Sequence, residues 1–123
     1  MDSPTHSVVF APVGTKTVRL VIRDNILEGV VHGDNMGNGS STWNEYAPDG
    51  TFLDNVVVVA NDGTVYPTGN TYPSSLAGIG FADLAGGDYH LSLVSTLKAQ
   101  VGARDPGADI DAITAAVSGV ILP

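Results

Sequence analysis

The chain contains no cysteine, so disulfide bonds, thiolate metal sites and cysteine nucleophiles are excluded. Only five of its 123 residues are lysine or arginine, against thirteen acids, which gives a formal net charge of −8. We expect no nucleic acid and no membrane as partner, because anionic polymers and anionic lipid surfaces both require clustered cations. The sequence also lacks any run approaching the ~20 apolar residues of a membrane span.

A recognisable leader is missing as well, because residues 1–6 carry neither the basic stretch nor the apolar stretch of a signal peptide. We therefore expect a soluble chain, and the sequence gives no prediction of its compartment. A hydrophobic content of 43% with 15% charged residues is typical of a folded protein. At this length we predict a single domain spanning residues 1–123.

Glycine and proline are abundant, with fifteen and seven residues, and they separate short stretches rich in β-branched side chains. This pattern predicts an all-β chain of short strands joined by turns. Strands are expected at residues 7–10, 17–23, 29–31, 51–53, 56–59, 64–66 and 89–94, with a turn at 48–50 and one helical turn within 74–79. Residues 32–42 are almost all polar or glycine, and we predict a loop there.

A short repeat links two of these strands. Asp24-Asn25-Ile26 and Asp54-Asn55-Val56 lie 30 residues apart, and each follows one apolar strand and precedes another. In a solenoid, equivalent corners lie above one another, so the two asparagine side chains would stack and hydrogen-bond along the axis. Two unrelated turns, each with an Asx hydrogen bond, explain the same residues, and the sequence leaves both interpretations open.

The one strong helix prediction covers residues 109–119. Asp109 is the expected N-cap, Asp111 lies in the first turn where the helix dipole favours an acid, and Gly119 is a natural terminator. One apolar stripe runs along it, formed by Ile110, Ile113, Val117 and Val120. We expect this stripe to cover the exposed end of the strand region.

The succession of motifs resembles the closing segment of bacterial right-handed parallel β-helix proteins, the pectate-lyase-like solenoids. The motifs are Leu20 to Ile26, Leu53 to Val59, Tyr66-Pro67-Thr68-Gly69-Asn70, Gly80-Phe81-Ala82-Asp83, Gly87-Asp88-Tyr89-His90-Leu91 and Asp105-Pro106-Gly107-Ala108-Asp109-Ile110-Asp111-Ala112. The resemblance implies a short right-handed parallel β-helix of two to three coils over residues 17–94, closed by a capping α-helix at 109–119. A small β-sandwich or roll is the alternative fold.

The short length has a physical consequence for such a fold. A β-helix cut across its axis exposes a row of unpaired strand N–H and C=O groups, and at least three repeats are usually needed for stability. Pairing two copies about a two-fold axis closes both open faces at once. We therefore predict a homodimer or small homo-oligomer.

The best candidate ligand site lies between residues 32 and 46. It combines an imidazole, carboxylates, amides and aromatic rings, and its members are His32, Asp34, Asn35, Asn38, Trp43, Glu45 and Tyr46. Such a set could bind a polysaccharide, with the indole stacking on a sugar ring while amides and carboxylates bond hydroxyl groups. Alternatively, the segment is a solvated loop whose Trp43 packs back onto the core.

No catalytic residue is predicted. Members of the resembled family that act on polysaccharides carry their catalytic residues on middle coils, which this chain lacks. The sequence therefore predicts a non-catalytic structural or interaction domain, with carbohydrate as the candidate ligand of residues 32–46. The alternative is a remnant polysaccharide lyase or glycoside hydrolase in which Asp34 and Glu45 act as the acid–base pair.

Two further groups of residues have side chains that could bind a metal ion or transfer a proton. Asp105, Asp109 and Asp111 are oxygen ligands of the kind that calcium prefers, but turn and cap roles explain all three, so no metal and no cofactor is predicted. His90 lies on an alternating segment and is expected to point away from the core, without the sequence context of a catalytic triad.

Overall fold

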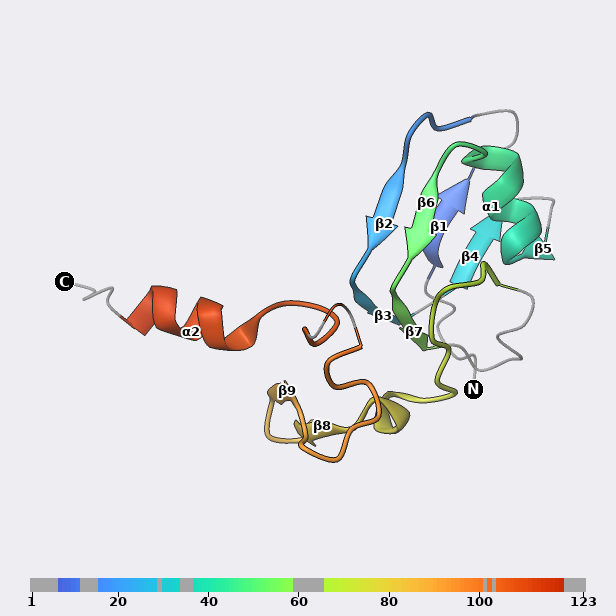
Figure 1. Cartoon of the computed structure of the whole chain (residues 1–123). Coiled ribbons are helices and arrows are strands. Elements are labelled where there is room, and N and C mark those ends of the chain that lie inside the picture. The colour runs from blue at the N-terminus through green and yellow to red at the C-terminus, as the bar shows by residue number, and fades with distance from the viewer. Residues whose placement is uncertain are drawn as a thin grey trace.

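The computed structural model describes residues 7–11, 16–28, 30–33, 37–58, 66–100, 102 and 104–118 (Figure 1). The elements are, in chain order, β1 (Ser7–Ala11), β2 (Val21–Arg23), β3 (Ile26–Glu28), β4 (Val30–Gly33), β5 (Gly37–Asn38), α1 (Ser40–Tyr46), β6 (Thr51–Leu53), β7 (Val56–Val58), the 3₁₀ turn η2 (Leu76–Ile79), β8 (Phe81–Asp83), β9 (Asp88–Leu91) and α2 (Ile110–Ser118). Short strands in small sheets are thus combined with helices. The chain is mixed α/β, and its described strands form no closed barrel.

Strands distant in the sequence pair in parallel in the N-terminal half. β2 pairs with β6 in the register Val21↔Thr51, and β3 pairs with β7 in the register Ile26↔Val56. β1 pairs with β4, also in parallel. The register of the two 30-residue pairings places the repeated Asp-Asn sequences side by side, as the spacing predicts.

The side chains on one face of these strands form the first core. The buried residues are Trp43, Ala47, Phe52, Val57 and Tyr66, and the half-buried Leu20, Ile22, Leu27 and Tyr72 pack against them. Alternation along β2 and β6 explains this arrangement, because Ile22 and Phe52 are register partners that point to the same side. The predicted strand at 17–23 is shorter than expected, since Val18 lies in a bend and is exposed.

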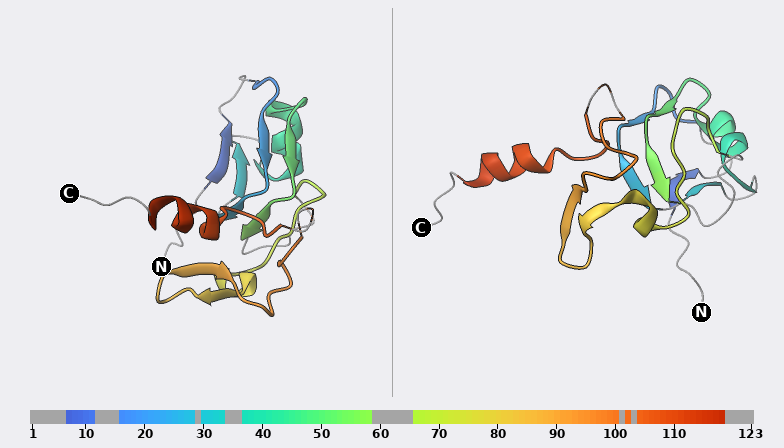
Figure 2. Two further views of the ribbon diagram at one scale, coloured as in Figure 1. Left: turned by 60° about the vertical axis from the view of Figure 1, so that its left-hand side comes forward. Right: turned by 60° about the horizontal axis from the view of Figure 1, so that its bottom comes forward.

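The opposite face of β7 carries a second core, to which the C-terminal half contributes. Val56 and Val58 pack against the buried side chains of Ile79, Leu91 and Leu97. The antiparallel hairpin β8–β9 supplies part of this cluster, and both views of Figure 2 place the hairpin to one side of the stacked strands. The predicted strand at 89–94 ends at Leu91, because a turn begins after Ser92.

The segment 32–42 is not the continuous loop predicted from its composition. β4 extends to Gly33, β5 returns antiparallel to it, and α1 begins at Ser40. The helix forms because burial overrides the weak helix propensity of its Ser-Ser-Thr start. Its buried members, Thr42, Trp43 and Tyr46, recur at helical spacing and face the strands.

Other local predictions are confirmed. A turn covers 48–50, with the Gly50 N–H donating to the Ala47 carbonyl at 2.8 Å, and η2 is the helical turn expected within 74–79. Residues 64 and 65 of the strand predicted at 64–66 lie outside the described residues, as does residue 59 of the strand predicted at 56–59.

The C-terminal helix forms where it was predicted, but the expectation that it caps the strands is wrong. Asp109 caps it, with its Oδ1 accepting from the Ala112 N–H at 2.8 Å. No residue of α2 is buried, and Figure 1 shows α2 projecting from the β2–β3 side of the molecule. The hairpin and η2 cover the outer face of β7 instead, so the helix has no described strand to close. Gly119 and Val120 lie outside the described residues.

Candidate functional site

The segment predicted to bind a ligand folds around β5 and α1. His32 and Asn38 face each other in the antiparallel register of β4 and β5. Asp34 and Asn35 lie outside the described residues, so the proposed pairing of Asp34 with Glu45 is not described. The structure therefore brings the backbones of two of the seven predicted residues together directly.

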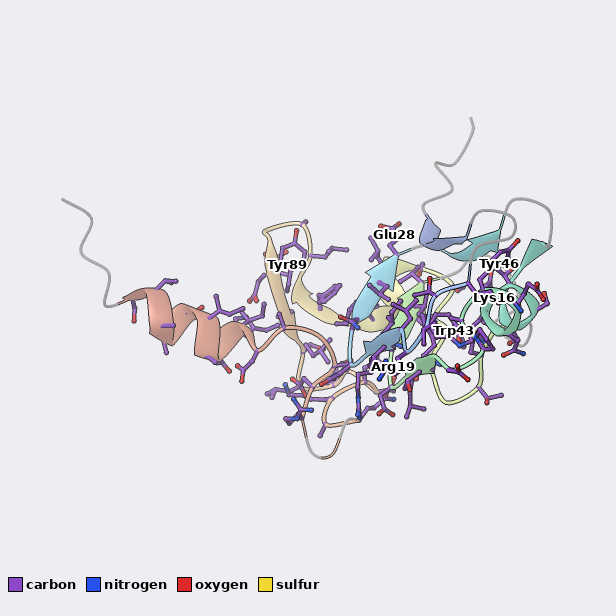
Figure 3. The ribbon with its side chains drawn as sticks, turned by 90° about the horizontal axis from the view of Figure 1, so that it is seen from above. Lys16, Arg19, Glu28, Trp43, Tyr46 and Tyr89 are labelled. Atoms are coloured by element: carbon purple, nitrogen blue, oxygen red, sulfur yellow. The ribbon has the colours of Figure 1, made fainter. Side chains whose placement is uncertain are left out.

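The aromatic members of that segment are core residues. Trp43 and Tyr46 are buried on α1, and the Trp43 ring lies 5.2 Å from the Phe52 ring between centroids. Figure 3 shows Trp43 directed from α1 toward the strands. Glu45 is exposed on the other side of the helix. The indole is therefore not an open stacking platform, which agrees with the alternative in which Trp43 packs onto the core.

A column of three asparagines runs along the stacked strands. Asn25 Nδ2 donates to Asn55 Oδ1 at 3.0 Å, and Asn55 Nδ2 donates to Asn70 Oδ1 at 3.0 Å. The backbone N–H groups of Asn25 and Asn55 bond the same acceptors at 3.2 and 2.9 Å. Of the two interpretations that the sequence leaves open, the stacking of Asn25 on Asn55 is the one observed. We call these three residues the asparagine ladder.

The third member of the asparagine ladder was missed from the sequence. Asn70 lies only 15 residues after Asn55, and the residue before it is glycine instead of aspartate. The shared signal is conformational, because the preceding residues Asp24, Asp54 and Gly69 all have left-handed backbones, with φ of 61°, 58° and 80°. Asp and Gly are both tolerated there, so the pattern Asp-or-Gly followed by Asn includes all three corners, although it also occurs at 34–35 and 37–38.

The asparagine ladder has a direction and an open end. Each asparagine donates toward the next, and within the described part of the chain no donor reaches Oδ1 of Asn25. The backbone bonds of β2 also leave donors on the outer side. The Thr51 N–H donates to the Leu20 carbonyl at 2.8 Å, so in this parallel pair Thr51 bonds the residues on either side of Val21. The N–H of Val21 itself therefore points away from β6. Among the described strands, β2 pairs with β6 alone and β3 with β7 alone. No described strand therefore pairs with the outer edge of β2 and β3, although the Gly107 N–H donates to the Asp24 carbonyl between them.

The mostly buried carboxylate of Asp24, at the first corner of the ladder, is ion-paired with Arg104. Asp24 Oδ2 accepts from Arg104 at 2.9 Å and its carbonyl accepts from the Gly107 N–H at 3.1 Å, whereas its buried Oδ1 has no partner among the described residues. Arg23 forms the equivalent ion pair with Asp54 at 3.3 Å. The segment around residues 104–107 is thereby fastened to the first corner of the ladder.

A second constellation lies between the hairpin and α2. His90 Nδ1 lies 2.5 Å from Asp88 Oδ1, and His90 Nε2 lies 3.2 Å from Asp111 Oδ1. The hydrogen bond to Asp88, with a smaller contribution from Asp111, raises the pKa of His90, and the same bond lowers the pKa of Asp88. A pocket of about 310 Å³ lies beside His90 and Asp111 and is lined further by Tyr89, Leu91 and residues 104–110.

The sequence did not predict this constellation. His90 and Asp88 are two residues apart on β9, but Asp111 follows 21 residues later and is brought in by the path of the chain between the hairpin and α2. Only a protonated imidazole donates from both nitrogens, so the two contacts together favour the charged form. The arrangement supplies a link between two elements, without a nucleophile beside the imidazole.

The three acids that could be calcium ligands, Asp105, Asp109 and Asp111, each have a partner within the protein. Asp105 accepts from Lys98 Nζ and from the Ala99 N–H, both at 2.8 Å, and Lys98 lowers the pKa of Asp105. Asp109 caps α2 and Asp111 contacts His90. Within the described residues no three histidine or acidic side chains are grouped to hold a metal ion.

Comparison with known proteins adds no relative: no family model, curated protein or solved structure matches the chain. In the described part of the chain, no helix has the length and apolar character required to cross a membrane.

Proposed function

We propose that the chain is a non-catalytic structural domain, a short right-handed parallel β-helix that self-associates through the unpaired β2–β3 edge. It acts by assembly, and its partner is a second copy of itself. Two things support the proposal: the resemblance to solenoid proteins, and the geometry of the corners that contain Asn25, Asn55 and Asn70.

The asparagine ladder is the observation that carries the proposal. Three successive corners have the same left-handed residue followed by an asparagine, and the amides bond from one corner to the next. Corners that stack in register are the repeating unit of a β-solenoid. The parallel pairs β2–β6 and β3–β7 support the same repeat on both sides of the corner.

The unpaired edge supports self-association. Exposed strand edges pair readily with other strands unless charge, proline or a covering element prevents it. β2 contains no proline, its one charged residue Arg23 is paired with Asp54, and its Val21 N–H points away from β6. Residues 104–107 contact the edge at Asp24, beyond the end of β2. A two-fold axis allows the same edge to serve both copies, so a closed dimer results instead of an open chain of copies.

The region between residues 32 and 46 supports a structural role over a catalytic one. Trp43 and Tyr46 contribute to the core, and Glu45 projects to solvent from the other side of α1. The buried rings supply apolar area to a small domain that needs it. We therefore assign this region to the packing of the β-helix.

The test is a proline at the edge. Val21→Pro removes the outward N–H while leaving the bonds from β2 to β6, because proline is tolerated on edge strands. Val21→Thr keeps the N–H and is the matched control. We expect sedimentation equilibrium to give a dimer for the natural chain and for Val21→Thr, and at least a tenfold weaker dimer for Val21→Pro. A monomer at all concentrations, or an unchanged Val21→Pro dimer, contradicts the proposal.

A further inference from the structure

The chain just before α2 lies over the first corner of the asparagine ladder, and we call its residues 104–107 the strap. The Gly107 N–H donates to the Asp24 carbonyl at 3.1 Å, and Arg104 Nη2 donates to Asp24 Oδ2 at 2.9 Å. Pro106 is buried. Figure 1 shows this part of the chain passing beside the junction of β2 and β3. The strap therefore covers the point where the two edge strands meet.

The backbone bond of the strap repeats the bond between successive corners. The Asp24 N–H donates to the Leu53 carbonyl at 3.3 Å, and the Asp54 N–H donates to the Gly69 carbonyl at 2.9 Å. In each bond the donor has a left-handed backbone, and Gly107, with φ of 90°, donates to Asp24 in the same direction. The strap thus takes, within one chain, the place that the corner of a preceding coil would occupy.

The ion pairs follow the same repeat. Arg23 contacts Asp54 on the following corner at 3.3 Å, and Arg104 contacts Asp24 at 2.9 Å. Arg104 lies three residues before the left-handed Gly107, whereas Arg23 lies one residue before its own corner. The guanidinium group reaches the carboxylate of the next corner in both cases, so the strap imitates a coil in charge as well as in backbone bonding.

The strap ends the asparagine ladder instead of extending it. Ala108 follows Gly107, whereas an asparagine follows the left-handed residue at each corner of the ladder. Alanine has no amide to donate to Asn25 Oδ1. A true preceding coil would supply that donor, so the strap is an incomplete substitute for one.

A strand that pairs along the whole outer edge must pass this corner. β2 ends at Arg23 and β3 begins at Ile26, so the Asp24 carbonyl lies between them on one edge. A Cβ at residue 107 would lie 3.1 Å from Ile26 Cγ1, which places the strap backbone against the start of β3. A covering loop prevents an edge from pairing. A partner's strand therefore reaches from β2 to β3 only when the strap is displaced.

Separate contacts hold the strap to the two halves of the molecule. Asp105 accepts from Lys98 Nζ and from the Ala99 N–H, both at 2.8 Å, and these bonds tie the strap to the C-terminal half. The Arg104 side chain on the corner is 70% exposed, and an ion pair so open to solvent adds little to stability. The strap can therefore leave the corner while Asp105 keeps it attached to its own half.

We infer that the strap is an autoinhibitory contact. When it is docked, it restricts self-association to β2, and when it is displaced, the continuous edge of β2 and β3 is open to a second copy. The inference rests on the proposed self-association, to which it adds a control of the affinity.

A reversible disulfide tests the competition, because the natural chain has no cysteine. A Cβ at residue 107 would lie 3.7 Å from Ile26 Cβ, within the range of about 3.5–4.5 Å that disulfides require. In the double variant Ile26→Cys with Gly107→Cys, oxidation locks the strap onto the edge and reduction frees it. We expect sedimentation equilibrium to give an at least tenfold weaker dimer for the oxidised protein than for the reduced protein. Both states carry the same substitutions, so equal dissociation constants overturn the inference.

A release variant separates this inference from the proposed function. Arg104→Gln removes the ion pair to Asp24 and should tighten the dimer at least threefold, whereas Lys16→Gln, which removes the same charge at an exposed position outside the strap, should not. A dimer unaffected by the lock and by Arg104→Gln leaves edge pairing standing and overturns the strap. A monomeric natural chain with a dimeric Arg104→Gln supports the strap and overturns self-association of the natural chain. Monomers in every variant overturn both.

Discussion

The two halves of the molecule are built on different ranges of contact. In the N-terminal half, β2–β6 and β3–β7 join residues 30 positions apart, and the asparagine ladder bonds their corners. In the C-terminal half, β8 and β9 form a local hairpin in which Asp83 pairs with Asp88. The first half gains its order from repetition of one corner. The second half gains its order from packing on the outer face of β7.

This difference explains why the halves use polar groups differently. Asn55 is only 1% exposed. Its burial is tolerated because Nδ2 donates to the Ile22 carbonyl and to Asn70 Oδ1, while Oδ1 accepts from Asn25. The side chains of Asp88, His90 and Asp111 are largely exposed, and their contacts fasten one surface element to another. Hydrogen-bonded polar groups thus hold the buried corners of the N-terminal half together, whereas in the C-terminal half they join elements at the surface.

The largest expected effect comes from breaking the apolar link between the halves. Ile79→Ala removes a fully buried side chain that packs with β7, and we expect a loss of about 2–5 kcal/mol in the free energy of unfolding. Trp43, the single tryptophan, lies in the other core and reports urea unfolding by fluorescence. Leu93→Ala, at an exposed position, is the control. An unchanged midpoint at Trp43 would mean that the halves unfold separately.

The ladder itself is tested by Asn55→Ala. Truncation removes the acceptor of the Asn25 backbone N–H and one of the two acceptors of Asn25 Nδ2, so we expect a loss of about 1–3 kcal/mol in the free energy of unfolding, measured by urea titration. Asn44→Ala, on the exposed side of α1, is matched in residue type and should change little. Equal effects at Asn44 and Asn55 would remove the energetic case for the ladder.

Two glycines with the same backbone conformation sharpen the comparison. Gly69 in the first half has φ of 80°, and Gly87 in the hairpin has φ of 81°. A Cβ at residue 69 lies 2.5 Å from Leu53 Cδ1, whereas a Cβ at residue 87 meets nothing within 4 Å. Both alanine variants incur about 1–2 kcal/mol of left-handed strain. We expect Gly69→Ala to lower the melting temperature further than Gly87→Ala, and the reverse order would show that Leu53 yields freely.

The smallest effect is expected at the link between the hairpin and α2. Because Asp88 and Asp111 raise the pKa of His90, its contribution is present below the unfolded value of ~6.5 and is lost as pH rises through the higher folded pKa. We expect the NMR shifts of α2 amides to follow the titration of the His90 ring. His90→Gln should remove this pH dependence, and α2 shifts that ignore the ring titration would refute the link.

Sequence reasoning was most successful where a local rule applies. The turn at 48–50, the cap at Asp109 and the matched corners at Asn25 and Asn55 all follow from short-range chemistry. It failed for α1, because a polar composition hides the helical spacing of Thr42, Trp43 and Tyr46 until the strands that bury them are in place. It also missed Asn70, whose corner is formed by Gly69.

The sequence by itself determined most of the strand-forming stretches, the C-terminal helix and the absence of cysteine chemistry, and it offered the stacked corner as one of two interpretations. These follow from backbone preferences and side-chain periodicity within a few residues. Only the tertiary structure decided that Trp43 is a core residue, that Asp111 meets His90, and that α2 stays unburied along its whole length. Each of these depends on where distant segments pass one another, which is fixed by burial and hydrogen bonding across the whole chain.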